Sequence, residues 1–126
     1  MTDRPPPRDN WPHDVPSAAE LVAAVRTYLA DDLGPRSEGR DRFLLRVAAN
    51  ALAIAEREIS ALPEDAAAHA EMLAAFGVAS EADLSAAIRA GSLDARHAEL
   101  AAALWTTTLA KLAVANPRYR DPSLES

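Results

Sequence analysis

The sequence predicts an all-α protein: an antiparallel helical bundle of three long and two short helices, preceded by a proline-rich N-terminal arm. Apolar residues recur at helical spacing through most of the chain, and no stretch alternates apolar and polar residues over the length of a strand. The expected helices are joined by short connections, which favour antiparallel neighbours. These observations together predict a bundle.

The first expected helix follows the arm. Residues 1–16 hold five of the nine prolines and are predicted to be extended or disordered. In "SAAE", Ser17 and Glu20 have the spacing of a capping box, which marks the start of a helix. This amphipathic helix should run for about four turns and end near Gly34 and Pro35.

Two further helices are predicted to meet at Pro63. The second helix starts at Arg36 or Ser37 and ends at Leu62, because the residue before a proline disfavours helical backbone. The third helix has the proline and two acidic residues in its first turn, where they suit the helix dipole. It should stop at Gly77.

The last two helices complete the predicted domain. "SEADLSAAIRAG" begins with another capping box, formed by Ser80 and Asp83, and ends in a glycine. The final helix is expected over residues 94–115, with an aspartate as its N-cap and an Asn-Pro pair after its end. Residues 17–119 are therefore predicted to form a single helical domain, followed by a loose tail at 120–126.

Composition excludes several classes of protein. The 126 residues, 49% hydrophobic and 25% charged, are enough for one globular domain. A net charge of −6 has the wrong sign for nucleic-acid binding, and the absence of cysteine excludes disulfides and thiolate metal sites. The polar, proline-rich start does not resemble a signal peptide, and the longest mainly apolar run, 47–55, is too short for a membrane span. We therefore expect a cytoplasmic protein that does not enter membranes.

One segment, "RFLLRVAANALAIAEREI" at residues 42–59, combines a strongly apolar surface with charged and amide side chains. On a helical projection the apolar side chains fill an arc of roughly 200°, wider than a surface helix needs. This helix is therefore expected at the centre of the bundle, with the arc against its neighbours. The apolar arc contains Phe43, Leu44, Leu45, Val47, Ala48, Ala51, Leu52, Ile54, Ala55 and Ile59. The remaining polar stripe contains Arg42, Arg46, Ala49, Asn50, Ala53, Glu56, Arg57 and Ser60.

Asn50 lies where the stripe meets the apolar arc, and two interpretations remain open. A boundary amide commonly bonds to a neighbouring helix or to loop backbone, which would give it a structural role. Alternatively, Arg42, Arg46 and Arg57 present an anion-binding face, on which Asn50 orients a polar group. Acidic residues nearby weaken the second interpretation, since local ion pairs would occupy the arginines.

The final helix carries a lysine within its apolar face. Lys111 can lay its aliphatic stem along apolar surface and keep its ammonium in water. In the alternative interpretation it points into a polar cleft shared with Asn116 and Arg118. The candidate ligand-binding residues are Arg46, Asn50, Arg57, Lys111, Asn116 and Arg118.

No recognisable catalytic or metal-binding motif is present. His13, His69 and His97 lie far apart on three segments, and the Glu-x-x-His motifs of di-metal bundles are absent. There is no glycine-rich phosphate loop, nucleophile elbow or Ser/His/Asp order. Residues 71–91 could be mistaken for a DNA-reading helix-turn-helix, but the second helix is acidic. We therefore expect no catalytic residue, metal or cofactor, and we favour a non-enzymatic protein over an enzyme with an unrecognised site.

The segments "RFLLRVAANALAIAERE" and "KLAVANPRY", together with "RPPP" and "AAIRAG", resemble a small bacterial family of uncharacterised helical proteins. Members of that family are often encoded beside acyl-CoA dehydrogenases and kinases that resemble aminoglycoside phosphotransferases. The resemblance covers nearly the whole chain. It implies a helical fold and a role near acyl-CoA or phosphotransferase chemistry, and it transfers no catalytic residue.

Two functions from different classes follow. The first is a non-enzymatic accessory protein that binds a protein partner, such as the dehydrogenase or the kinase-like protein that the resemblance implies, with homo-oligomer formation as a further option. The second is a small-molecule binding protein for an anionic ligand, either phosphate-bearing or acyl-CoA-like. The second requires the candidate residues of the two helices to converge.

Overall fold

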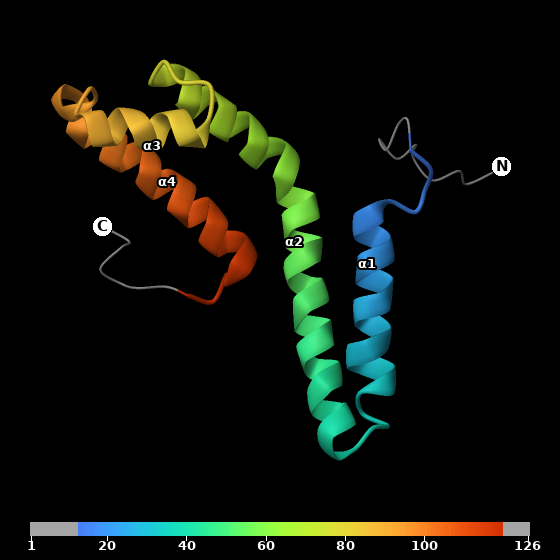
Figure 1. Ribbon diagram of the computed structural model, residues 1–126. Helices are drawn as coiled ribbons and strands as arrows, with labels where there is room; N and C mark the ends of the chain where they lie inside the picture. The colour runs from blue at the N-terminus through green and yellow to red at the C-terminus, as the bar shows by residue number, and fades with distance from the viewer. Residues whose placement is uncertain (1–12, 120–126) are drawn as a thin grey trace. The chain divides into compact units, whose positions relative to one another are not determined.

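The computed structural model describes residues 13–119, which contain helices and no strand (Figure 1). The all-α class is confirmed. Most of the predicted arm and the predicted tail at 120–126 lie outside the described residues. The elements are α1 (Ala18–Thr27), the π-helical turn η1 (Tyr28–Leu33), α2 (Gly39–Ala75), α3 (Glu81–Ala90), the 3-10 turn η2 (Asp94–Arg96) and α4 (His97–Ala115).

The chain divides into two compact units, which we call the N-terminal unit, ending at Ile59, and the C-terminal unit, beginning at Ser60. The N-terminal unit contains α1, η1 and the first part of α2. The C-terminal unit contains the remainder of α2, then α3, η2 and α4. Helix α2 therefore contributes residues to both units.

Pro63 lies inside α2, so the prediction of two helices meeting there was wrong. The described residues contain four α-helices, and one of them, 37 residues long, replaces the second and third helices that we expected. A proline inside a helix removes the backbone donor at its own position, but the residues on either side can keep theirs. The alanine-rich sequence after Pro63 has high helix propensity and favours continuation.

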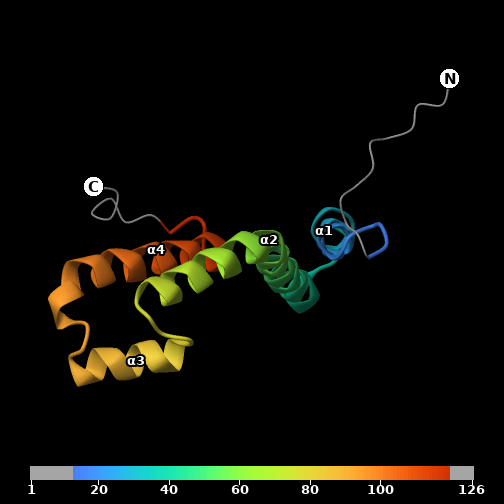
Figure 2. The ribbon, with the colours of Figure 1, turned by 90° about the horizontal axis from the view of Figure 1, so that it is seen from above.

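In the N-terminal unit, α1 and the first part of α2 run antiparallel and side by side (Figures 1 and 2). The predicted capping box is confirmed, since the Ser17 hydroxyl accepts from the Glu20 N–H at 3.2 Å and the Glu20 carboxylate accepts from the Ser17 N–H at 3.3 Å. The predicted end near Gly34 is also confirmed. The buried Gly34 donates its N–H to the Leu29 carbonyl at 2.9 Å, and a Cβ there would lie 2.8 Å from that oxygen.

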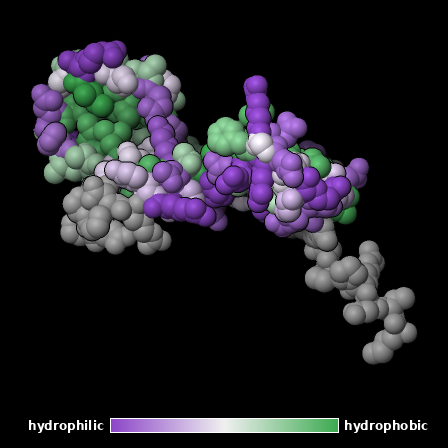
Figure 3. Space-filling model, turned by 90° about the horizontal axis from the view of Figure 1, so that it is seen from below, coloured by the Kyte–Doolittle hydropathy of each residue, from purple (hydrophilic) through white to green (hydrophobic). Residues whose placement is uncertain are grey.

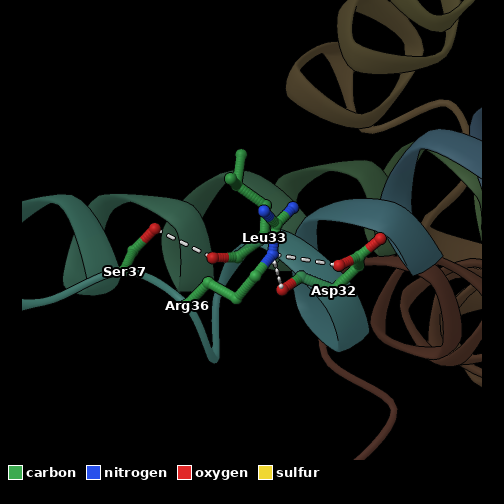
Figure 4. Close-up of polar contacts among 4 residues, drawn as sticks. All are labelled: Asp32, Leu33, Arg36 and Ser37. Carbon is green, nitrogen blue, oxygen red and sulfur yellow. Dashed lines mark hydrogen bonds and ion pairs between the residues drawn. The ribbon is translucent and has the colours of Figure 1, made fainter.

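The turn between α1 and α2 is closed by side chains that bond to the end of η1 (Figure 4). The Ser37 hydroxyl donates to the Leu33 carbonyl at 2.8 Å. The Arg36 guanidinium donates to the Asp32 carbonyl at 3.3 Å and to its carboxylate at 3.1 Å. These bonds satisfy carbonyl groups that the end of a helix would otherwise leave without donors.

The C-terminal unit contains a small hydrophobic core. Ser80 caps α3 by accepting from the Asp83 N–H at 3.1 Å, and Gly91 ends that helix with φ of 77°. The N-cap and the final glycine are as predicted, but the Asp83 carboxylate does not accept from the Ser80 N–H, so only half of the predicted capping box forms. These caps set the two ends of α3, which follows α2 and precedes α4 in the sequence. The core cluster is contributed by α2, the turn directly after it, α3, the connection before η2 and α4, and it consists of Leu73, Phe76, Leu84, Leu93 and Leu100.

Asp94 was predicted as the N-cap of the last helix, but α4 begins one short turn later, at His97. Asp94 opens η2 instead, and Arg96 occupies the N-cap position of α4. The Asp94 N–H bonds to the Gly91 carbonyl and the Arg96 N–H to the Leu93 carbonyl, at 3.2 and 2.9 Å. Three-residue hydrogen bonds of this kind wind a tighter 3-10 turn, which is common at a helix N-terminus. The predicted end at Ala115 is confirmed.

Candidate functional site

The six candidate residues fall into two groups of three, one in each unit. Those of the N-terminal unit lie on α2, and those of the C-terminal unit lie on α4 or directly after it. Five of the six are exposed, and Arg57 is half-buried. The convergence of both groups on one site stays a prediction. The groups are Arg46, Asn50 and Arg57, and Lys111, Asn116 and Arg118.

Within the N-terminal unit, Arg46 and Asn50 lie one helical turn apart on α2. Neither side chain makes a hydrogen bond or an ion pair with the other residues of the described part of the chain. Glu56 is held instead by α1, because the Arg26 guanidinium donates to its carboxylate at 2.7 Å. Arg46 therefore keeps its donors available, and Asn50 does not make the structural bond that one interpretation expected.

Helix α1 packs against the alanine side of the polar stripe of α2. Among residues 13–59, Ala49 is the buried hydrophobic residue, at 9% exposure, and Glu56 contacts α1 through its ion pair. We expected the broad apolar arc to pack against neighbouring helices, and for much of the arc in this unit that expectation was wrong. Phe43, Leu44 and Val47 are 60%, 45% and 50% exposed. Alanine allows helix axes to approach closely, which favours the stripe as the packing surface.

Large apolar side chains of α1 and η1 are also uncovered. Leu21, Val25 and Tyr28 recur at helical spacing and are 53%, 51% and 47% exposed. We call the exposed side chains of Phe43, Leu44 and Val47 on α2 the N-terminal apolar face. Sequence reasoning missed the exposure of this face, although the excessive width of the α2 arc was a signal for it.

In the C-terminal unit, α4 is apolar but little buried. Leu100 is its one buried residue, whereas Trp105 and Leu109 are 36% and 44% exposed. The segment Asp94–Ala115 is long and apolar enough to cross a membrane by length and composition alone, criteria that a core helix of a soluble protein also meets. The left-hand part of Figure 3, which is the C-terminal unit, shows an apolar area bordered by hydrophilic side chains. Helix α4 thus offers a second surface suited to a partner.

A family model described as a domain of unknown function, DUF6285, matches residues 35–119. The chain belongs to this family. The DUF6285 region starts after η1 and contains α2, α3 and α4, which agrees with the resemblance to an uncharacterised family. Comparison with curated proteins and with solved structures gave no match.

Arg96 is the polar residue that ties the DUF6285 core together, and sequence reasoning missed it. Its guanidinium lies 4.5 Å from the centre of the Phe76 ring and donates to the Ala75 carbonyl at 3.0 Å. Glu99 accepts from the Nε of Arg96 at 2.6 Å. Arg96 therefore covers the C-terminal end of α2 and packs on a core aromatic, which gives it a structural role.

One histidine of the DUF6285 region pairs with an acidic side chain. The His69 Nε2 lies 3.3 Å from a Glu81 carboxylate oxygen, which joins α2 to the first turn of α3. Within residues 13–119, no group of three or more His, Asp or Glu side chains is arranged to hold a metal ion.

Proposed function

We propose that the protein is a non-enzymatic accessory protein that binds a protein partner through α4. The observation that carries this proposal is that an apolar helix of 19 residues has Leu100 as its one buried residue. A helix that is apolar around most of its circumference is normally enclosed by other structure. Here that enclosure would come from the partner.

Trp105 and Leu109 are the side chains best suited to anchor the partner. They lie one turn apart on α4, so both project to the same side of the helix. Tryptophan is enriched among the side chains that dominate binding energy at interfaces. An apolar helix face of this type docks into a hydrophobic groove. In the proposed complex the helices of the partner complete an antiparallel bundle with α4.

The partner class comes from the family resemblance. We propose an acyl-CoA dehydrogenase or a kinase-like protein encoded beside the gene, in a bacterial cytoplasm. Lys111 and Arg118 at the end of α4 are exposed cations, which favours a partner whose groove has an acidic rim near that end. The three candidate cations and amides at the end of α4 would then lie at the edge of the interface, where polar groups set orientation more than affinity.

The test uses the full chain and each purified candidate partner in isothermal titration calorimetry. We expect a dissociation constant in the micromolar range or tighter, and Trp105→Ser should weaken binding by at least about tenfold. Ile88→Ser is the matched control, because Ile88 is 40% exposed on α3 and also loses a large apolar side chain. Absence of binding to both partners at micromolar concentrations, or equal loss in the two variants, contradicts the proposal.

A second candidate function is anion binding at Arg46 and Asn50, because both are exposed, unpaired within the described residues and one turn apart. Coenzyme A and inorganic phosphate are the probes. If this function holds, Arg46→Ala abolishes binding measured by calorimetry. Lys111→Ala tests whether the C-terminal group shares the site, and an unchanged affinity in that variant assigns the ligand to the N-terminal unit alone.

A further inference from the structure

We propose that two copies of this chain pair through their N-terminal units, with α2 of each copy antiparallel to α2 of the other about a two-fold axis. The starting point is the N-terminal apolar face. In the described part of this unit Ala49 is buried, whereas Phe43, Leu44 and Val47 of α2 are about half exposed, on the side of α2 away from its ion pair with α1. An amphipathic helix of this kind is stabilised when a second helix covers its apolar side.

The charges on α2 favour an antiparallel copy as the occupant. Arg40 and Glu58 are both exposed, and neither makes a hydrogen bond or ion pair within the described part of the chain. They are 18 residues apart, about five full turns, so both lie on one line along the helix. That line runs through the middle of the apolar arc. A helix running the opposite way places Glu58 of the second copy beside Arg40, and the two-fold axis repeats the pair.

The apolar residues between these charges have the same symmetry. Positions 43 and 55, 44 and 54, and 47 and 51 are equidistant from position 49, and all are apolar. In an antiparallel pairing centred near position 49, apolar side chains therefore meet apolar side chains along the whole seam. An isologous interface requires a surface that is complementary to itself in this way. The seam residues are Phe43, Leu44, Val47, Ala51, Ile54 and Ala55.

The seam covers the exposed parts of three large side chains in each copy. Half of a large apolar side chain is on the order of 100 Å², so Phe43, Leu44 and Val47 offer about 300 Å² per copy, and the aliphatic stems of Arg40 and Glu58 add to this area. The total lies below that of stable interfaces, so we expect a weak dimer whose formation depends on protein concentration.

Other occupants fit this face less well. A lipid surface would have to accept Arg40 and Glu58 in the middle of the buried strip, at high desolvation cost. A helix from another protein would need an acidic and a basic residue at the same spacing as Arg40 and Glu58, placed to face them. An antiparallel second copy of this chain has that arrangement by symmetry. The pairing uses the N-terminal unit, so it does not depend on the partner proposed for α4.

The test is sedimentation equilibrium of the full chain at low ionic strength, where exposed ion pairs are least screened. Arg40→Glu and Glu58→Arg each place like charges opposite one another twice per dimer, and each should raise the dissociation constant by roughly ten- to thirtyfold. The double variant, Arg40→Glu with Glu58→Arg, restores opposite charges and should return the dissociation constant to within about threefold of the original. Arg89→Glu, the same charge change on exposed α3, is the control.

A monomer at all concentrations up to hundreds of micromolar overturns the proposal. The antiparallel α2 seam is overturned if neither single charge reversal changes the dissociation constant of the dimer. It is also overturned if the double variant does not restore the dissociation constant. Circular dichroism on each variant separates loss of pairing from loss of helix, and recovery in the double variant excludes a folding defect. Calorimetry with the α4 partner is measured separately, so failure there leaves the dimer result standing.

Discussion

The two units use the same helical building blocks but bury very different side chains. The C-terminal unit encloses leucines and a phenylalanine from several elements, and Leu84 at its centre is 2% exposed. The N-terminal unit brings α1 and α2 together over Ala49 and an ion pair, while Phe43 and Val47 remain outside. Large buried side chains are therefore found in the C-terminal unit, and the described part of the N-terminal unit buries only a small one.

This difference teaches that close helix packing and hydrophobic stabilisation are separate quantities. Alanine contacts bring two helices near each other but remove little apolar area from water, and the stabilisation scales with that area. Leucine contacts remove much more. We therefore expect the C-terminal unit to be stable within one chain, and the N-terminal unit to gain much of its stability from the second copy.

The largest expected effect is that of Leu84→Ala. Removal of a fully buried leucine leaves a cavity and should lower the free energy of unfolding by about 2–5 kcal/mol. Phe43→Ala removes a larger side chain that is 60% exposed, and in dilute monomer it should cost under about 1 kcal/mol. Urea denaturation followed by circular dichroism measures both. Equal costs would mean that Phe43 is covered within the monomer, which breaks the contrast between the units.

The sequence predicted the helices well wherever a local signal defines an end. The residues that end or begin a helix act through hydrogen bonds or backbone angles close to them in sequence, so their effects can be predicted from the sequence alone. They are Ser17, Gly34, Ser80 and Gly91. Pro63 misled the prediction for the same reason. Its local penalty is real, but whether a helix ends there depends on the propensity of the residues that follow and on their packing.

The candidate site was less predictable because a helical projection gives directions but not neighbours. It placed Ala49 and Glu56 on the polar side of α2 correctly, yet could not show that α1 would pack there. It likewise placed Arg46 and Lys111 on helix faces without fixing a distance between them. Sequence reasoning missed Arg96 because its partners, the Phe76 ring and the Ala75 carbonyl, are about twenty residues away along the chain.

A smaller effect is expected at Arg96, which sharpens the account of the C-terminal core. Arg96→Ala loses the contact over the Phe76 ring and the donor to the Ala75 carbonyl, and it should cost about 1–2 kcal/mol of unfolding free energy. Arg96→Lys keeps the charge but not the planar fork, so it should recover less than half of that loss. Full recovery in the lysine variant would show that charge alone matters there.

The smallest effect tests how much the ion pair contributes to the N-terminal unit. Arg26 and Glu56 are 34% and 28% exposed, whereas Arg36 and Asp32 are 61% and 60% exposed, so the first pair is less screened by water. Double-mutant cycles built from Arg26→Met with Glu56→Gln should give a coupling energy of about 1 kcal/mol. The matched cycle with Arg36→Met and Asp32→Asn should give under about 0.5 kcal/mol. Equal couplings would mean that the ion pair between α1 and α2 contributes no more than an exposed pair, and the dependence of the unit on a second copy would then be stronger still.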